Sequence, residues 1–421
     1  MTFPILGGNG AVAGYSIDNS LRFNDNDSPT LTRTPSTTNR RTWTFSGWIK
    51  RGNIGLGNTS FFGVGQSGYE AGCHLLSDSL EVYNYDADGG GYTLQLKTNR
   101  LFRDVSAWYH IVFAVDTTQS TSTDRVKLYI NGVQETSFSS SVYPSQNHDT
   151  MVNFSSRNFI IGNITSSSAY WDGYIGEYNF IDGQQLSPTD FGEFDENSGI
   201  WKPIEYTGSY GTNGFYLDFE NSGSLGADQS GNGNNFTPTN LASTDQTTDT
   251  PTNNFATLNP LQRSSTSAVL SEGNCKLTNN TTSNPWQSSY STIGMNTGKW
   301  YWEYKVDSQN ASIDPAYGIV ADSNTQYQDN TYGNLLGQQD STASSYGISF
   351  YGGDGTVYWS HIGGFSNSSA FGGHSVGDII GVAVDFDNDA IYFSVNGTYV
   401  NSGDPTSGAS KTGAVTTRFA N

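Results

Sequence analysis

Short runs in which apolar and polar residues alternate constrain the fold of this chain more than any other feature. In residues 43–50, Trp43, Phe45 and Ile49 would share one face of an extended strand, because successive side chains of a strand point to opposite faces. Residues 109–115 alternate in the same way. A helix would need its apolar residues three or four positions apart, so these runs predict strands with one buried face.

The strands are expected to pair as antiparallel hairpins in both halves of the chain. Residues 126–130 alternate again, and Asn131-Gly132 follows them directly. Both of these residues tolerate the positive φ that a tight hairpin turn requires. The pattern then restarts at residues 300–306 and continues in later runs up to residue 397. Antiparallel sheet is therefore predicted for both halves.

The composition agrees with a folded chain of many short strands. Of the 421 residues, 34% are hydrophobic and 14% aromatic, and 49 are glycines. Disordered segments lack the apolar surface that offsets chain entropy, so a disordered chain is excluded. Ser, Thr, Asn and Gly separate the apolar runs, which is typical of strands joined by turns and excludes an all-helical protein. Since the length exceeds one compact core, we predict an all-β protein with two antiparallel β-sandwich (jelly-roll) domains in tandem.

The chain divides into four segments by composition and pattern. Residues 222–262 are rich in Ser, Thr, Asn, Asp and Gly, and their pattern leaves open whether they form a linker or an ordered crossover. One helix is expected in residues 186–194, with Ser187 as its N-cap and Pro188 at its first position. The expected segments are an N-terminal arm at 1–15, a first sandwich at 16–221, the linker or crossover at 222–262, and a second sandwich at 263–421.

Charge and cysteine content exclude several classes of protein. The formal net charge is -20, which would repel a phosphate backbone, so no nucleic-acid partner is expected. The start of the chain has neither the basic nor the apolar region of a signal peptide, and no run is long enough to span a membrane. We expect a soluble chain made in the cytoplasm, without membrane insertion. Cys73 and Cys275 have no Cys or His at zinc-ligand spacing and are interpreted as buried thiols in different domains.

Two families resemble the two halves. The segments FSGWIKRG, WYHIVFAVD, KLYINGVQE, FIIGN and WDGYIGEYNFIDGQQLSPTDF resemble, in order, laminin-G-like modules of the concanavalin A-like lectin/glucanase superfamily over residues 16–203. The segments GKWYWEYKV, AYGIV and VGDIIGVAVDFDNDAIYFSVNG look like a B30.2/SPRY domain. The resemblances imply concanavalin A-like sandwiches. Because SPRY domains usually continue beyond the last hairpin, the second domain is expected to be incomplete at residue 421 or closed by a partner.

The pairing of these modules is similar to structural proteins in the virions of tailed phages from marine bacteria. The resemblance implies a tail fibre, capsid fibre or decoration protein, located in the virion and synthesised in the host cytoplasm. A single shallow sugar site binds weakly, so useful adhesion requires several copies, and a homo-oligomer, such as a trimer, is expected. The expected partners are a host-surface glycan or other virion proteins.

Catalytic motifs fail on spacing. Glucanases of the superfamily carry Glu-x-Asp-x-Glu on one strand, which sets two carboxylates against the same sugar. The nearest string is residues 193–196, Glu-Phe-Asp-Glu, whose last carboxylate would point away from the first two. No nucleophile elbow accompanies the five histidines, and His110 is interpreted as a hydrogen-bonded structural residue. We therefore expect no enzyme activity, although carboxylates that converge from separate strands leave no spacing signature.

No cofactor is expected beyond a possible structural calcium ion, which the laminin-G-like resemblance implies at the rim of the first sandwich. The candidate ligands are the acidic residues near predicted strand ends, Asp116, Asp172 and Asp218. In residues 385–389 the acidic spacing imitates a calcium loop, but Ala390 and Asn396 replace the Gly and Glu that such a loop needs, so a β-turn explains it better.

Sugar binding needs an aromatic face for the ring and polar groups for the hydroxyls. Aromatic residues in predicted loops or on the second domain's rim are the candidate ligand-binding residues: Tyr83, Tyr85, Tyr170, Trp171, Trp286, Tyr327, Tyr332 and Trp359. Each could instead pack a sandwich edge.

The leading hypothesis is a non-enzymatic virion protein that binds a host-surface glycan or a neighbouring virion protein through sandwich-rim loops. The alternatives are a polysaccharide depolymerase, a structural spacer with no external ligand, and a secreted cell adhesin.

Overall fold

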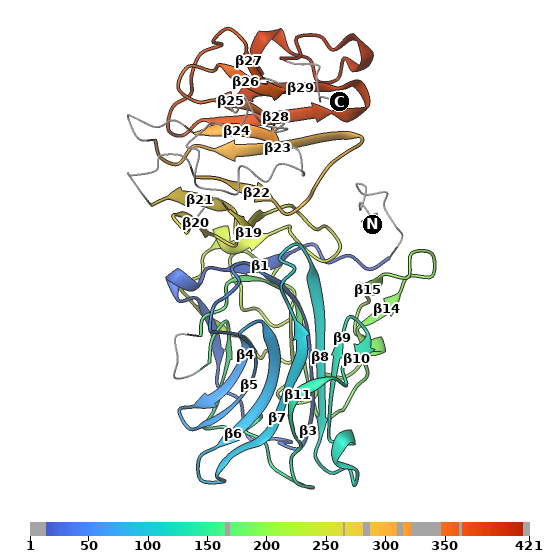
Figure 1. The fold of residues 1–421 in the computed structure, drawn as a ribbon. Coiled ribbons are helices and arrows are strands. Elements are labelled where there is room, and N and C mark those ends of the chain that lie inside the picture. The colour runs from blue at the N-terminus through green and yellow to red at the C-terminus, as the bar shows by residue number, and fades with distance from the viewer. Residues whose placement is uncertain are drawn as a thin grey trace. The chain divides into compact units, whose positions relative to one another are not determined.

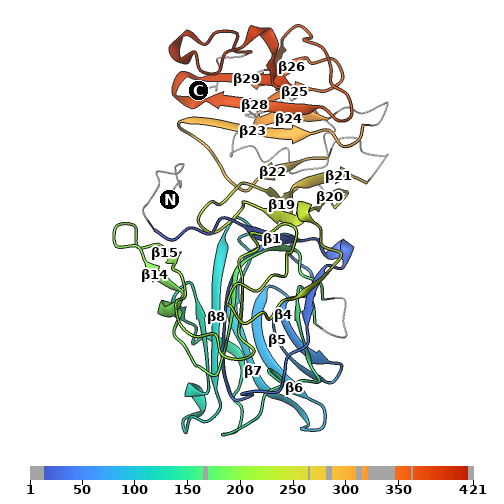
Figure 2. The same cartoon turned by 180° about the vertical axis from the view of Figure 1, so that it is seen from behind.

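The computed structural model describes residues 14–164, 169–263, 266–280, 287–309, 315–320, 347–361 and 364–415. The chain separates into two compact units. Unit 1 consists of Met1–Leu261 and Leu270–Lys276, and unit 2 consists of Gln262–Val269 and Leu277–Asn421. Figures 1 and 2 show that both units are built of strands. The predicted all-β fold is therefore confirmed. Among the described residues, no helix is long and apolar enough to cross a membrane.

Unit 1 is a sandwich of two eight-stranded antiparallel sheets, here named sheet A and sheet B. Sheet A has the spatial order β10 (Val133–Gln134), β9 (Val126–Ile130), β8 (Trp108–Asp116), β3 (Thr42–Arg51), β13 (Gly173–Asp182), β1 (Ser20–Phe23) and β18 (Gln246–Thr247), with β16 (Phe215–Leu217) paired to β13. Sheet B has the order β11 (Phe138–Val142), β7 (Gly91–Leu101), β6 (Ser79–Asp86), β5 (Tyr69–Leu76), β4 (Asn58–Gln66), β12 (Asn158–Ile161), β2 (Thr30–Arg33) and β17 (Thr237–Thr239). In Figures 1 and 2, β4 to β7 lie side by side in one curved layer, and β8 lies in the other.

The core lies between the inner faces of the two sheets, as the alternation predicts. Trp43, Phe45 and Ile49 of β3 are all buried in it, as are alternate apolar residues of β8 and β9, namely Ile111, Phe113, Val115, Val126, Leu128 and Ile130. Phe45 and Phe113 pair across neighbouring strands with ring centroids 5.0 Å apart. The predicted hairpin turn is also confirmed, since Asn131 and Gly132 have φ values of 49° and 79°.

The outer face of sheet A is covered by a second aromatic layer. Trp48, Trp108, Tyr174 and Trp201 pack together there with Ile17. His110 lies under Trp201, which donates its indole N–H to His110 Nδ1 at 3.0 Å, while Ser46 Oγ lies 2.8 Å from His110 Nε2. Burial lowers the pKa of His110 to about 3, so the ring is neutral. The structural role expected for this histidine is confirmed.

Two local expectations are wrong. The helix expected in residues 186–194 is a single 3-10 turn, η3 (Pro188–Asp190), followed by β14 (Gly192–Phe194), which pairs with β15 (Trp201–Pro203). Ser187 is the N-cap, as expected, and forms a capping box with Asp190, but burying Phe191 and pairing β14 end the helix after one turn. Cys275 is exposed rather than buried, and both cysteines are free and lie in unit 1.

Of residues 222–262, expected to be a linker or an ordered crossover, residues 222–261 belong to unit 1. They contribute β17 to the edge of sheet B and β18 to the edge of sheet A. Further along the chain are the short strands β19 (Leu258–Arg263), β20 (Ala268–Ser271), β21 (Lys276–Asn279) and β22 (Ser289–Ser291). The helical segments of the described residues are single 3-10 turns; besides η3 they are η1 (Asp25–Asp27), η2 (Ser122–Asp124), η4 (Ser243–Asp245), η6 (Phe386–Asn388), η7 (Val400–Ser402) and η8 (Gly408–Ser410).

Unit 2 contains two four-stranded antiparallel sheets. One has the order β23 (Lys299–Lys305), β28 (Ile379–Asp385), β29 (Ala390–Val395) and β30 (Thr398–Tyr399), and the other β24 (Ala316–Val320), β25 (Gly347–Tyr351), β26 (Val357–His361) and β27 (Gly364–Asn367). Residues of both sheets share one apolar core, for example Phe350 and Phe393, whose rings stack 5.5 Å apart. Trp302, Tyr304 and Val306 pack in or against this core, as the alternation of residues 300–306 predicts.

Candidate functional site

The outer face of sheet B carries a group of polar and aromatic side chains from three consecutive strands. The alternation that sends Cys73, Val82 and Leu96 into the core turns their neighbours outward. Strand register then places His74 opposite Glu81, and Tyr85 opposite Tyr92. The group, here named the outer-face cluster, consists of Glu70, His74, Glu81, Tyr83, Tyr85, Tyr92 and Gln95.

A chain of hydrogen bonds holds the buried part of this cluster. His74 Nε2 lies 3.3 Å from Glu81 Oε2, and Gln95 donates to Glu81 Oε1 at 2.6 Å. Ser140 of β11 donates in turn to Gln95 Oε1 at 2.7 Å. Burial raises the pKa of Glu81, but the bonds from His74 and Gln95 outweigh it and hold that pKa below its ordinary value. Glu81 is thus an ionised acceptor, 1% exposed, that orients its neighbours.

The three tyrosines of the cluster contact one another and differ in how far they are exposed. Tyr83 is buried against the His74 ring, with centroids 4.9 Å apart, while Tyr92 is 46% exposed. Tyr92 meets the edges of Tyr83 and Tyr85 at 6.1 and 5.2 Å. Gly72 lies opposite Tyr83, and a Cβ there would come within 3.1 Å of the tyrosine ring. Glycine at this position therefore leaves room for the Tyr83 ring beside β5.

Hydrogen-bonding groups border the aromatic surface. The Tyr83 hydroxyl donates to Glu70 Oε2 at 3.4 Å. Burial and then the charge of Glu70 raise the pKa of Tyr83, so its hydroxyl remains a neutral donor. Glu70 and Tyr85 are half-buried, which leaves part of each open to solvent. An exposed ring beside a carboxylate and phenol hydroxyls is the combination that holds a sugar by its apolar face and its hydroxyls.

The aromatic residues predicted from the sequence to bind a ligand lie in different parts of the structure. Tyr83 and Tyr85 lie in the outer-face cluster. Trp171 has no exposed surface and packs at the core against Phe61, so it is a core residue; Tyr170 beside it is half-buried. In unit 2, Trp359 of β26 packs half-buried against the core. The remaining candidates lie outside the described residues: Trp286, Tyr327 and Tyr332.

The other members of the outer-face cluster were not nominated from the sequence. They are Glu70, His74, Glu81, Tyr92 and Gln95. The signal that could have found them is the alternation of apolar and polar residues in 70–97, which predicts three consecutive strands. These strands pair as consecutive hairpins. Period two then puts His74, Glu81 and Tyr83 on the face opposite Val82 and Cys73.

The three carboxylates suggested as calcium ligands lie in different surroundings. Asp116 is engaged by Thr118, Gln119 and Thr42; burial raises its pKa, but these bonds outweigh it and lower the pKa. Asp218 accepts the Glu220 N–H, and burial raises its pKa. Asp116 therefore has no free oxygen pair to offer. Among the described residues, no group of three or more His, Cys, Asp or Glu side chains could hold a metal ion.

Asp172 is the suggested ligand whose surroundings fit a cation. It is 3% exposed, its Oδ1 has no hydrogen-bond partner in the described structure, and Asn53 donates to its Oδ2 at 2.5 Å. Asp25 Oδ1 is also buried without a partner. Burial, and then the charge of Asp25, raise the pKa of Asp172 to about 7. Two adjacent buried carboxylates repel one another, and a bound cation such as Ca²⁺ would remove that repulsion.

Sequence comparison assigns the first sandwich. Residues 23–190 match a laminin G family model described as the concanavalin A-like lectin/glucanases superfamily. This part of the chain is a concanavalin A-like domain. The matched residues contain all three strands of the outer-face cluster, which therefore lies on the concanavalin A-like domain itself. No curated protein matches the chain.

Solved structures give only distant similarities. The chain is similar to a candidate carbohydrate-binding protein from Bacteroides ovatus, at 14% identity, over 56% of this chain and 60% of that one, with a TM-score of 0.37. It is similar to domains LG4-5 of the mouse laminin α1 chain, at 12% identity, 97% and 83% coverage and a TM-score of 0.32. It is also similar to domain 4 of the arabinanase AbnA from Geobacillus stearothermophilus, solved with arabinotriose, at 20% identity, 44% and 79% coverage and a TM-score of 0.31. At these values the similarities carry no argument about function.

Proposed function

We propose that the chain is a non-enzymatic glycan-binding protein, and that the outer-face cluster of the concanavalin A-like domain is its binding surface. The observation that carries the proposal is the exposed ring of Tyr92, held by two further tyrosines beside the Glu70 carboxylate. A sugar ring would stack on Tyr92, and Glu70 would accept bonds from its hydroxyls.

The biological setting is part of the same proposal. The sequence resemblances support a virion protein of a tailed phage, in which a SPRY-like second domain accompanies the concanavalin A-like one. The ligand would then be a host-surface glycan, or a neighbouring virion protein, and the chain would reach the virion from the host cytoplasm. A single stacked sugar gives weak binding, so several copies, as in a trimeric fibre, would supply the avidity.

The state of the carboxylates supports binding rather than hydrolysis. A glycosidase needs one carboxylic acid and one carboxylate, both in contact with the sugar. In the cluster, both Glu81 oxygens are engaged by His74 and Gln95, and the residue is 1% exposed. Of the two glutamates in the cluster, Glu70 is then the one with a share of solvent contact, and one carboxylate does not make the pair.

Affinity electrophoresis tests the proposal. The purified chain is run through gels containing host-type polysaccharides, with and without a calcium chelator, while released reducing ends are assayed. We expect retardation by at least one polysaccharide without sugar release. Tyr92→Ala should weaken binding about tenfold, which corresponds to about 1.4 kcal/mol and is typical of an aromatic anchor.

Tyr301→Ala is the matched control, because Tyr301 is a similarly exposed tyrosine (53%) on β23 of unit 2. If both variants bind as the unchanged chain does, the outer-face cluster is not the binding surface. Release of reducing ends would support a depolymerase instead. A chain that is retarded by no polysaccharide would favour the structural spacer.

A further inference from the structure

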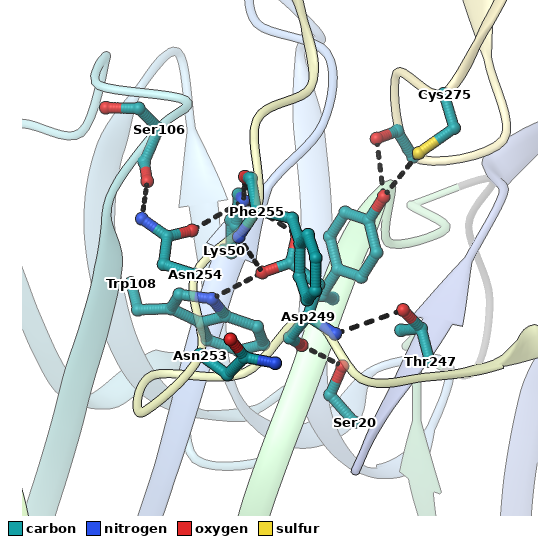
Figure 3. A network of polar contacts seen from close by, with 12 residues as sticks. Ser20, Lys50, Ser106, Trp108, Thr247, Asp249, Asn253, Asn254, Phe255 and Cys275 are labelled. Carbon is teal, nitrogen blue, oxygen red and sulfur yellow. Dashed lines mark hydrogen bonds and ion pairs between the residues drawn. The ribbon is translucent and has the colours of Figure 1, made fainter. Parts of the chain in front are cut away.

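A buried lysine of unit 1 lies against a carboxylate and a carboxamide from one distant segment. Lys50 is on the outer face of β3, and its Nζ lies 2.8 Å from Asp249 Oδ2, 2.8 Å from Asn254 Oδ1 and 2.8 Å from the Phe255 carbonyl oxygen. Figure 3 shows these residues converging, with Trp108 beside Asp249. Asp249 and Asn254 are 199 and 204 positions from Lys50 in the sequence.

The surroundings of Lys50 exclude water. Its side chain is 0% exposed and that of Asp249 is 5% exposed. Trp108 donates its indole N–H to Asp249 Oδ1 at 3.1 Å, and the Tyr174 ring centroid is 5.7 Å from Nζ. Burial lowers the pKa of Lys50, although Asp249 acts in the opposite direction. The Lys50 amine is therefore more readily neutral in this site than it would be in water. A neutral amine is a nucleophile.

We propose that Lys50 and Asn254 are joined by an intramolecular amide bond, formed without any other protein and promoted by Asp249. The Lys50 ammonium gives a proton to Asp249 Oδ2 along their hydrogen bond. The free amine then adds to Cγ of Asn254, the Nζ–Cγ bond forms, and the Cγ–Nδ2 bond breaks. A proton of the adding nitrogen passes to Nδ2, which departs as ammonia and takes up the proton held by Asp249, so the lysine charge leaves as ammonium.

The geometry brings the reacting atoms near the distance that addition requires. Nζ is 2.8 Å from Oδ1 of Asn254, and a C=O bond is about 1.2 Å long, so Cγ lies within about 4 Å of Nζ. A near-attack separation is about 3 to 3.5 Å, so a shift of about 1 Å or less is enough. Asn254 Nδ2 donates to the Ser106 carbonyl oxygen at 2.8 Å, which holds the carboxamide in place.

The bond would join residues 249–255 covalently to β3, a central strand of sheet A. This segment follows β18 at the edge of sheet A, and an edge segment is held otherwise by a few polar contacts. A covalent link between positions 204 apart closes a long loop, which restricts the unfolded chain in the manner of a disulfide but resists reduction. The bond would form whether or not the chain binds a glycan.

The intact mass of the purified full-length chain tests the proposal. We expect it to lie below the sequence mass by one ammonia, about 17 Da. Because a succinimide at any asparagine gives the same loss, digestion with trypsin must also yield one peptide in which the Lys50 and Asn254 segments are joined, with no cleavage after Lys50.

Three variants complete the test. Asn254→Ala removes the carbon under attack, and Asp249→Asn removes the proton acceptor; both should keep their full mass. Asn253→Ala, at the neighbouring asparagine, should still lose the ammonia. A wild-type chain that keeps its full mass after prolonged incubation, with normal cleavage after Lys50, would overturn the proposal and leave Lys50 as an ammonium held by three acceptors. The wild-type mass decides this even if a variant fails to fold.

Discussion

The carboxyl group of Glu177 makes the stability of unit 1 depend on pH in a way that can be measured. Glu177 lies in β13 at an irregularity between Gly176 and Asn179, with a φ of 50°. It is 5% exposed and accepts hydrogen bonds from the hydroxyls of Tyr15 (2.7 Å) and Tyr216 (3.0 Å). Burial raises the pKa of Glu177 to about 7, and the two tyrosines only partly oppose this.

The size of the effect follows from the shift. The pKa rises from 4.5 to about 7, and each unit corresponds to about 1.4 kcal/mol, so ionisation of the folded group costs about 3 kcal/mol. A raised pKa means that folding favours the protonated form. The protonated Glu177 therefore makes its full contribution to the free energy of unfolding below the unfolded pKa of about 4.5. That contribution is lost as the pH rises through the folded pKa of about 7.

Glu177→Gln mimics the protonated form at every pH, so its stability should not fall in this way. Urea unfolding of both proteins at pH 5 and pH 8 should show the variant gaining roughly 2 to 3 kcal/mol relative to wild type between the two pH values. Glu196→Gln, at an exposed glutamate, is the control and should show no such gain. If the wild-type and Glu177→Gln stabilities change in parallel with pH, Glu177 is not a buried carboxyl and the reasoning fails.

Three further changes test the fold and the calcium hypothesis. Phe113→Ala opens a cavity between the sheets and should lower the free energy of unfolding by about 3 to 5 kcal/mol, measured by urea unfolding. Gly132→Ala places a Cβ within 2.3 Å of the Trp201 ring at a φ of 79°, and should lower the thermal midpoint by at least several degrees; unchanged melting would mean that the turn is not as described. Millimolar Ca²⁺ should raise the melting temperature of wild type but not of Asp172→Asn, and an equal rise in both would remove Asp172 from the ligand set.

Much of the fold follows from local pattern. Phe45, Phe113 and Leu128 could be assigned to the core because alternation on a strand divides its residues between two faces. The Asn131-Gly132 turn follows from the rarity of residues that accept positive φ. The helix predicted at Pro188 is wrong because a capping residue marks only where a helix starts. The length of the helix depends on what the following residues bury.

The candidate site could be predicted only in part. Tyr83 and Tyr85 could be predicted because they are aromatic residues flanked by polar ones. The same pattern also predicted Trp171, which is buried in the core. An aromatic side chain is equally suited to a buried core and to a ligand-binding surface, so residue type and neighbouring residues do not distinguish the two roles. Burial decides between them, and burial depends on which strand lies over the residue.

By itself, the sequence determined that the chain is all-β, which faces of its main strands are buried, and where one tight hairpin turns. These are consequences of side-chain period and backbone preference, which act over a few residues. Only the tertiary structure brought Asp172 to Asp25, and Lys50 to Asp249 and Asn254. Pairing between distant strands places these groups together, and the free energy that selects it comes from the whole core rather than from the residues of the site.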